Sequence, residues 1–279
     1  ELSAYFSSTL GQYGNQKVSF GLSKKLNSWL SVKASLAADQ YDGNWQNDLA
    51  DGPSVGGEKT RSAMFGLVVA PTIDSQLSLN YIRNSNQDQH TPFVFQGPEY
   101  NNCFLDTRAY YCGEANRELP IVIGGLLHKQ DYGLNSTREH TNMMYQRAFD
   151  DFDFHWSSAK NSMTSDNGID QTYSGYQETF NFAYFSGGPL LTEASFWHTD
   201  DRLTSEETSL ELRISASALQ DTLYWVVGGF YWQKSDSPSD ENTAPSDNKN
   251  IALMGSTSYD FTDDFSLSVE ARRSKDKID

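Results

Sequence analysis

Apolar and polar residues alternate along many short segments of this chain, and no segment has the spacing of an amphipathic helix. The alternation is clearest over residues 30–36, which read Leu-Ser-Val-Lys-Ala-Ser-Leu, and over 210–215, which read Leu-Glu-Leu-Arg-Ile-Ser. Because successive side chains of a strand point to opposite faces, a period of two predicts strands with one apolar and one polar face. We therefore predict an all-β fold.

The same pattern predicts thirteen strands, most of them close to the length of about ten residues that crosses a bilayer as a tilted strand. Apolar residues on one face and polar residues on the other suit either half of a sandwich or the wall of a membrane barrel. The predicted strands are 2–11, 16–24, 28–40, 60–71, 76–87, 138–149, 152–161, 172–185, 190–199, 207–217, 221–234, 249–261 and 264–274.

The lengths of the connections favour the barrel. Short turns are predicted near residues 24–27, 72–75, 186–189, 218–220 and 262–263, whereas long loops are predicted at 41–59, 88–137 and 235–248. Short turns at one end and long loops at the other are typical of outer-membrane barrels. We expect an antiparallel meander over residues 1–279, with unpaired edges at 2–11 and 264–274 and with the long loops on the extracellular side.

The phase of each strand predicts which side chains face the lipid and which face the lumen, because a strand cannot change face without a bulge. The residues expected to point outward are Val18, Phe20, Leu22, Leu30, Val32, Ala34, Leu36, Phe65, Leu67, Val69, Leu210, Leu212, Ile214, Phe265, Leu267 and Val269. Those expected to face the lumen are Lys33, Glu211, Arg213, Glu270 and Arg272.

The composition agrees with a barrel wall. Apolar residues make up 37% of the 279 residues, whereas aromatic residues reach 13%. A small apolar share with many aromatic residues fits a barrel that has a polar lumen and aromatic girdles. The chain has no run of about 18 apolar residues that would form a transmembrane helix.

The net charge is −16, which makes nucleic acid an unsuitable partner. Much of this charge lies in the predicted loops. Two interpretations stay open: the charge keeps the loops soluble, or it favours a cationic or metal-bearing ligand.

Two cysteines, Cys103 and Cys112, lie in the loop at 88–137. An isolated close pair in a loop predicts a local disulfide, with Cα atoms within about 7 Å, and hence an oxidising compartment. A metal site would require further Cys or His residues at ligand spacing, and none is close in the sequence.

The sequence gives no indication of catalysis, and we predict neither an enzyme nor a bound cofactor or metal. The five histidines, His90, His128, His140, His155 and His198, are scattered, and no nucleophile or metalloprotease motif accompanies them. The acidic residues of 235–248 do not have calcium-loop spacing.

Three stretches resemble the barrel of TonB-dependent outer-membrane receptors. In that family a Glu-Leu-Arg-Leu strand precedes a short turn and a Trp-Gly-Phe-Tyr strand. Here residues 211–215 read Glu-Leu-Arg-Ile-Ser, and 223–231 read Leu-Tyr-Trp-Val-Val-Gly-Gly-Phe-Tyr. Residues 39–47 followed by 60–63, and the strand–turn–strand pair at 256–267, are similar to the family as well. These stretches follow the family's order and together extend over nearly the whole chain.

The chain departs from the family pattern in three ways. The N-terminal plug and TonB box are absent, thirteen strands are predicted where the family's barrels have 22, and the final strand does not end in an aromatic residue. Both ends of the sequence look cut, so we expect about the first half of a barrel and a fragment of a longer protein.

The resemblance implies an outer-membrane receptor that imports a scarce ligand, such as an iron–siderophore, a vitamin B12-like molecule or a glycan. The implied partners are the TonB–ExbB–ExbD complex, acting through the missing plug, the small-molecule ligand and outer-membrane lipid. A passive porin-like channel and a secreted β-sandwich or adhesin remain as alternatives. Aromatic loop residues are the candidates for ligand contact: Trp45, Tyr100, Phe104, Tyr110 and Tyr111.

Overall fold

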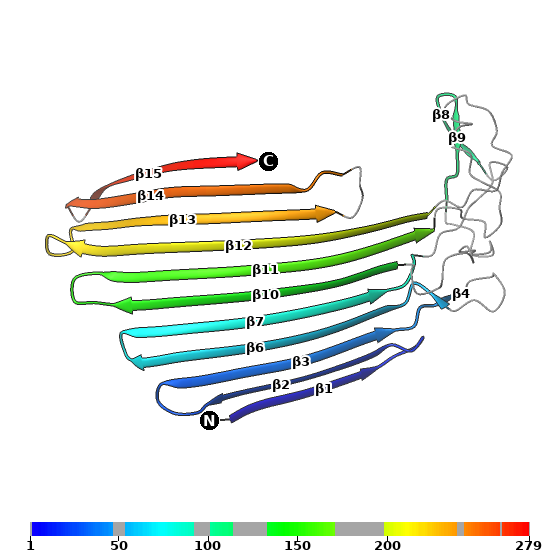
Figure 1. Ribbon diagram of the computed structural model, residues 1–279, viewed down its shortest axis with the longest axis horizontal. Helices are drawn as coiled ribbons and strands as arrows, with labels where there is room; N and C mark the ends of the chain where they lie inside the picture. Colours follow the sequence, from blue (N-terminus) through cyan, green and yellow to red (C-terminus); the bar gives the residue numbers. More distant parts are fainter. Residues whose placement is uncertain are drawn as a thin grey trace.

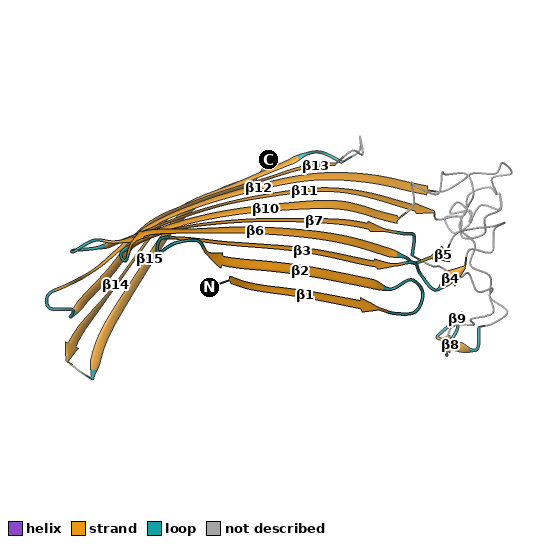
Figure 2. Cartoon of the chain, turned by 90° about the horizontal axis from the view of Figure 1, so that it is seen from below, coloured by secondary structure: helices purple, strands orange, loops and turns teal. Residues whose placement is uncertain are grey.

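The computed structural model describes residues 2–46, 54–91, 101–113, 133–170, 198–238, 243–262 and 264–278. One curved, single-layered sheet of eleven strands dominates it, accompanied by two short hairpins (Figures 1 and 2). The sheet consists of β1 (Leu2–Leu10), β2 (Gln16–Lys25), β3 (Leu30–Tyr41), β6 (Glu58–Thr72), β7 (Ser75–Asp88), β10 (Gly133–Ala148), β11 (Asp153–Asp170), β12 (His198–Ala218), β13 (Leu223–Pro238), β14 (Ser246–Thr262) and β15 (Phe265–Ile278). The described residues include no helix that is long and apolar enough to span a membrane.

Every strand of this sheet pairs antiparallel with its neighbour along the sheet, in the order in which the strands occur in the sequence. The all-β class and the antiparallel meander are therefore confirmed. The sheet is open, and β1 and β15 form its two edges, as the sequence predicted. Open edges present unpaired N–H and C=O groups, which a closed barrel would pair.

The predicted strand pairing is corrected in one region. β11 pairs directly with β12 along their whole lengths, from Asp153–Ser215 to Asp170–His198. No further strand therefore lies between them in the sheet. The predicted strand at 172–185, and all but the last two residues of that at 190–199, lie outside the described residues. The sheet thus contains eleven described strands rather than thirteen.

The predicted strand lengths and loop bounds are also corrected. β11 extends to Asp170 and β12 begins at His198, well beyond the predicted ranges, and β13 and β14 occupy half of the loop predicted at 235–248. The pairing is carried by backbone hydrogen bonds, which do not require apolar side chains. Apolar alternation identifies only the part of a strand that is apolar on one side, so the polar extensions were missed.

The backbone register joins the apolar sides of all strands into one surface, here called the apolar face. Phe20 lies opposite Leu36, Ala34 lies opposite Phe65, and Trp156 lies opposite Leu212. All the residues predicted to point outward share this face. The residues predicted to face the lumen lie on the other side, here called the polar face.

The apolar face has no second layer of structure over it (Figure 2). Leu36 remains 60% exposed and Leu253 remains 68% exposed, and among the described residues the buried apolar side chains are Val55, Ala216 and Ala252. A sandwich requires a dry core between two sheets. The described structure supplies only one wall of such a core, which disfavours the sandwich.

Apolar residues form a band that occupies only part of the apolar face and crosses the strands at a slant. The band ends between Ala38 and Gln40 on β3 but between Ala271 and Arg273 on β15, on the side of the sheet where the long loops lie. By backbone register, Arg273 is level with Leu30, near the start of β3. The boundary thus shifts by about one residue per strand, as expected where a horizontal slab cuts the tilted strands of a barrel.

Except for the short turn 11–15 between β1 and β2, the connections are sorted by length between the two ends of the sheet (Figure 1). At one end, here called the turn end, the strands are joined by residues 26–29, 73–74, 149–152 and 219–222. The tightness of these turns is illustrated by Phe149 and Phe152, whose rings stack at 4.5 Å between centroids. At the other end, here called the loop end, β3 is separated from β6, and β7 from β10, by much longer segments.

Candidate ligand-binding surface

The loop end carries two hairpins beyond the rim of the sheet (Figures 1 and 2). The first pairs β4 (Trp45–Gln46) with β5 (Ser54–Val55), between β3 and β6. The second pairs β8 (Cys103–Leu105) with β9 (Arg108–Tyr110), between β7 and β10. Surface connections of this kind, held by a rigid scaffold, are where binding residues usually occur.

The β8–β9 hairpin is closed by a disulfide between Cys103 and Cys112, whose Cα atoms are 5.7 Å apart. The Asn102 side chain reinforces the closure, because its Oδ1 accepts a hydrogen bond from the Cys112 N–H at 2.7 Å and its Nδ2 donates to the Cys112 carbonyl at 3.0 Å. These contacts hold a small hairpin that has little apolar core of its own.

Three of the predicted ligand-contact residues lie on this hairpin. Phe104 is 72% exposed, Tyr110 is 46% exposed and Tyr111 is 37% exposed. Cys103 pairs with Tyr110 and Phe104 pairs with Ala109, so Phe104 and Tyr110 project from opposite faces of the hairpin. The hairpin therefore presents aromatic surface on both sides.

The other two candidates are placed differently. Trp45 lies on the β4–β5 hairpin, opposite Val55, and is 37% exposed. Tyr100 lies outside the described residues. The structure thus brings three of the predicted residues together on one hairpin and places Trp45 on a second hairpin at the same end of the sheet.

A pocket of about 340 Å³ opens at the loop end above β6, β7, β10 and β11. Its rim is held by backbone hydrogen bonds from the Gly56 N–H to the His90 carbonyl at 3.2 Å and from the Gln89 N–H to the Gly57 carbonyl at 2.8 Å. Gly133 begins β10 with φ of +103°, and a Cβ there would collide with the Asp88 carbonyl. Glycine is therefore required where β10 enters the pocket wall.

Two carboxylates face each other in this pocket. Glu58 and Asp88 form a cross-strand pair at the ends of β6 and β7. Burial raises the pKa of Asp88 above its usual value, and the charge of Glu58 raises it further, while a hydrogen bond from the Lys59 backbone opposes the shift. The pocket therefore carries negative charge that disfavours anions at its mouth.

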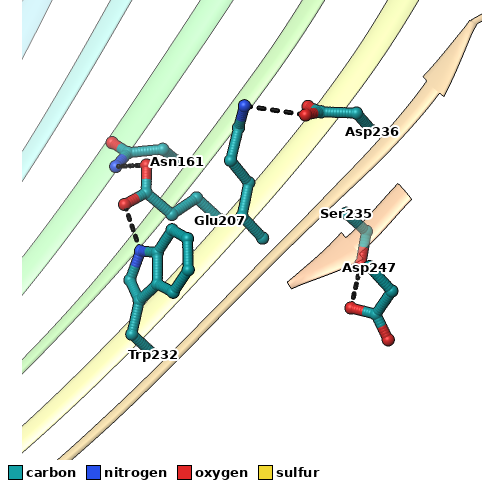
Figure 3. Close-up of polar contacts among 7 residues, drawn as sticks. Asn161, Glu207, Trp232, Ser235, Asp236 and Asp247 are labelled. Atoms are coloured by element: carbon teal, nitrogen blue, oxygen red, sulfur yellow. Dashed lines mark hydrogen bonds and ion pairs between the residues drawn. The ribbon is translucent and has the colours of Figure 1, made fainter. Parts of the chain in front are cut away.

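A polar network crosses four strands of the polar face. Asn161 on β11 donates to Glu207 Oε2 on β12 at 3.2 Å, and the Trp232 indole N–H on β13 donates to Glu207 Oε1 at 2.6 Å (Figure 3). His140 on β10 contacts the Asn161 amide oxygen through Nδ1. Each carboxylate oxygen of Glu207 thus has a donor, which fixes its orientation on the wall.

Two aspartates on β13 and β14, Asp236 on the polar face and Asp247 on the apolar face, are paired with lysines. Lys234 Nζ lies 2.7 Å from Asp236 Oδ2, and this hydrogen bond lowers the pKa of Asp236. Lys249 Nζ lies 2.9 Å from Asp247 Oδ2 and lowers the pKa of Asp247 in the same way. Ser235 also donates to Asp247 at 3.2 Å (Figure 3). Both carboxylates are therefore ionised at neutral pH.

A second hollow, of about 420 Å³, lies across β1, β2, β3 and β6. Its polar-face lining is dominated by Ser and Thr hydroxyls, together with the ion pair Lys17–Asp39, at 2.6 Å between Nζ and Oδ2. The hydrogen bond with Asp39 raises the pKa of Lys17. This part of the wall offers donors and acceptors to a polar surface placed against it.

The described residues offer exposed aromatic rings and fixed polar side chains that a ligand could contact. In the part of the chain that the structure describes, no group of three or more His, Cys, Asp or Glu side chains is placed to hold a metal ion. The sequence pointed to the aromatic hairpin through its cysteine pair. It did not reveal the Asn161–Glu207–Trp232 network, because residues that are distant in sequence meet only through the strand register.

No protein-family model matches the chain, and no curated protein sequence is similar to it. Solved structures are similar in fold. The ferric yersiniabactin uptake receptor FyuA from Yersinia pestis aligns with 100% of this chain and 43% of its own, at a TM-score of 0.63 and 11% identity. The ferric-catecholate import receptor Fiu from E. coli K12 aligns with 98% of this chain and 44% of its own, at a TM-score of 0.64 and 9% identity.

The ferripyoverdine receptor of the outer membrane of Pseudomonas aeruginosa, in a structure with ferripyoverdine bound, is similar as well. It aligns with 100% of this chain and 38% of its own, at a TM-score of 0.57 and 12% identity. At these identities the likeness concerns the fold. The open sheet of this chain has the fold of part of the antiparallel β-barrel of outer-membrane siderophore receptors, and the chain spans less than half of their length.

Proposed function

We propose that the chain forms part of the wall of an outer-membrane receptor that imports a scarce ligand. The observation that carries the proposal is the slanted apolar band, which continues across the sheet and gives way to charged residues toward the loop end. A band of this kind matches the lipid-facing surface of a barrel. The apolar face then contacts lipid, the polar face lines the lumen, and the loop end is extracellular.

The ligand in this proposal is an iron–siderophore, since the similar structures are described as receptors for ferric yersiniabactin, ferric catecholates and ferripyoverdine. The aromatic residues Trp45, Phe104, Tyr110 and Tyr111 provide exposed surface at the extracellular end. A siderophore with flat, conjugated iron-binding groups gains stacking contacts on such rings. A vitamin B12-like molecule and a glycan are the other cargoes that the same surface can accept.

Import in this proposal is energised by the TonB–ExbB–ExbD complex, acting through a plug domain. The chain itself contributes capture and a guiding wall. Ligand contacts the loop-end aromatic residues first and then the Ser-, Thr- and Asn-rich polar face. Fixed side chains such as Glu207 present hydrogen-bonding groups without first reorganising.

The test is uptake of a ⁵⁵Fe-labelled siderophore panel by Gram-negative cells whose only siderophore receptor is the full-length protein. We expect accumulation that stops on adding a protonophore. Deleting residues 93–118, which removes the aromatic hairpin, should abolish uptake. Deleting 239–243, between β13 and β14, is the matched control and should leave uptake intact. Heat-modifiable gel mobility reports whether each variant assembles as a barrel.

Uptake that survives the protonophore, or that persists after the deletion of 93–118, contradicts the proposal and indicates a passive pore. A passive pore would keep or increase its permeability when an extracellular loop is removed. A panel in which only cobalamin or glycans accumulate would preserve energised import but replace the siderophore as cargo.

A further inference from the structure

One tryptophan of the sheet lies on the polar face. The described strands of the sheet contain Trp156, Trp225 and Trp232. The register places the first two on the apolar face and Trp232 on the polar face, where its side chain is partly exposed. Contact with lipid therefore explains Trp156 and Trp225, but it does not explain Trp232.

A carboxylate lies on each side of Trp232 across the sheet. Glu207 of β12 accepts the Trp232 indole N–H through Oε1 at 2.6 Å and the Asn161 amide through Oε2 at 3.2 Å (Figure 3). In the other direction, Asp276 of β15 lies two strands from Trp232 and accepts a hydrogen bond from the Asn250 amide of β14. Neutral donors thus orient both carboxylates without cancelling their charge.

The surroundings of the ring are rich in acceptors and short of donors. Asn250 lies directly opposite Trp232, and its Nδ2 donates to Asp276. The Asn250 Oδ1 atom is buried and has no hydrogen-bond donor among the described residues. Lys234, the next residue of β13 on this face, is paired with Asp236 at 2.7 Å. An aromatic ring flanked by negative charge and by an unused acceptor is the composition of a site for a cation.

We propose that the polar-face surface formed by Glu207, Trp232, Asn250 and Asp276, here called the indole site, binds the ammonium group of a cationic ligand. The quadrupole of an indole ring attracts a cation placed over its face. An ammonium group also brings three N–H donors, together with the charge that the two carboxylates attract. This inference rests on the proposed function only in that the ligand is then the imported cargo, which carries a cationic arm.

The charge nearer the loop end indicates the same class of ligand. Glu58 and Asp88 face each other in the pocket at the rim of the sheet, and the whole chain carries a net charge of −16. A negative entrance raises the local concentration of cations and repels anions. A neutral polyol would gain nothing from this field. The acidic character of the chain therefore favours a cationic ligand over an anionic or a neutral one.

The test uses the purified full-length protein in detergent micelles, labelled with fluorotryptophan and observed by fluorine NMR. The Trp232 resonance, assigned with the variant Trp232→Phe, should shift saturably when cadaverine, a diammonium probe, is added. Pentanediol of the same chain length, which carries hydroxyl groups in place of the ammonium groups, should leave that resonance in place. The Trp225 resonance, from the apolar face of the same strand, is the internal control and should not move.

Two variants test the carboxylates. Glu207→Gln and Asp276→Asn each remove one charge but keep an acceptor oxygen, and each should weaken cadaverine binding about fivefold. Glu270→Gln is the matched control, because Glu270 lies on the same face of β15 as Asp276 but about 20 Å further along the strand. It should bind cadaverine as the unmodified protein does.

An equal shift with pentanediol would overturn the proposal and indicate a site for neutral hydroxyl groups. Full affinity in both Glu207→Gln and Asp276→Asn would overturn it as well, and so would an equal loss in Glu270→Gln. If the carboxylate variants do not assemble, the comparison of cadaverine with pentanediol on the unmodified protein still decides the matter.

The assignment of the ligand as cargo has its own test. In the uptake assay, an iron trihydroxamate with a pendant ammonium group should accumulate faster than its N-acetylated form, and equal rates would overturn this assignment. The NMR measurements do not involve uptake. Failure of import would therefore leave the indole site standing, and failure of cadaverine binding would leave import untouched.

Discussion

Replacing Ile214 by arginine should be the most destabilising change in a series of arginine substitutions along β12. The apolar-face positions of β12 within the band run from Leu210 to Ala218, and Ile214 is the central one. Its cross-strand neighbours on that face are Phe154 and Val227. An arginine there would place its guanidinium against acyl chains with no acidic partner opposite.

The expected loss of stability depends on how deep in the bilayer the arginine lies. An arginine on the lipid face costs about 2–4 kcal/mol at the bilayer midplane and about 0–1 kcal/mol near the interface. A strand that rises about 3.3 Å per residue and tilts by about 40° changes depth by about 5 Å for every two residues. Ile214→Arg should therefore cost about 3 kcal/mol and Leu212→Arg somewhat less. Thr208→Arg, beyond the band, should cost under about 1 kcal/mol.

The polar face supplies the control at the same depth. Arg213 already occupies that face between Leu212 and Ile214, where it lies 2.9 Å from Glu211. A second arginine at Ser215, whose cross-strand neighbour is Asp153, should therefore be tolerated within about 1 kcal/mol. Comparing Ser215→Arg with Ile214→Arg therefore separates the effect of the face on which a charge lies from the effect of its position along the strand.

The assay is reversible urea unfolding of the full-length protein in phospholipid vesicles, followed by tryptophan fluorescence. The free energy of unfolding should fall in the order Thr208→Arg, Leu212→Arg, Ile214→Arg. Equal losses at Thr208 and Ile214 would refute the assignment of the band to the membrane. A loss at Ser215 as large as that at Ile214 would refute the assignment of the faces.

Three further predictions concern the loop end and the polar face. Asp88→Asn should stabilise the protein by about 0.5 kcal/mol at pH 7, since it removes like-charge repulsion from Glu58. Because the folded-state pKa of Asp88 is raised, the unmodified protein should gain the same stability as the pH falls through that pKa, whereas the variant should not. Urea unfolding at pH 7 and pH 4 would detect this difference. Mass spectrometry of the unreduced protein should find no free thiol at Cys103 or Cys112, and two free thiols would contradict the disulfide. Reduction should remove roughly 2–3 kcal/mol of hairpin stability and should speed amide hydrogen exchange in the hairpin. Glu207→Ala should lower the free energy of unfolding by about 1–2 kcal/mol and shift tryptophan fluorescence, because it leaves the Trp232 indole N–H without an acceptor. Glu207→Gln should lower it less. Equal losses would show that the hydrogen bond between Trp232 and Glu207 contributes little.

The alternation of single strands could be predicted from the sequence because it is a local property of the backbone. Lys33 and Val32 must point to opposite sides of β3 whatever β3 pairs with, and the structure places them so. The sorting of short turns and long loops was also readable, since turn length depends on neighbouring residues. These two features together indicated an antiparallel meander with one apolar face.

The extent of the strands depended on their partners. β11 and β12 continue to Asp170 and His198 through residues that are mostly polar on both sides. Such residues carry no apolar alternation, and they are in a strand because the neighbouring backbone supplies hydrogen bonds. The sequence therefore indicated the membrane-crossing parts of the strands and missed the extensions beyond them.

One part of the candidate binding surface could be predicted from the sequence, and another part could not. The sequence pointed to the aromatic hairpin because its two cysteines are close together along the chain. Asn161 and Glu207 are 46 residues apart, and their contact exists only because the β11–β12 register sets them directly opposite each other. Local alternation determines which side of a strand a residue occupies, whereas only the register between strands determines which residues it meets there.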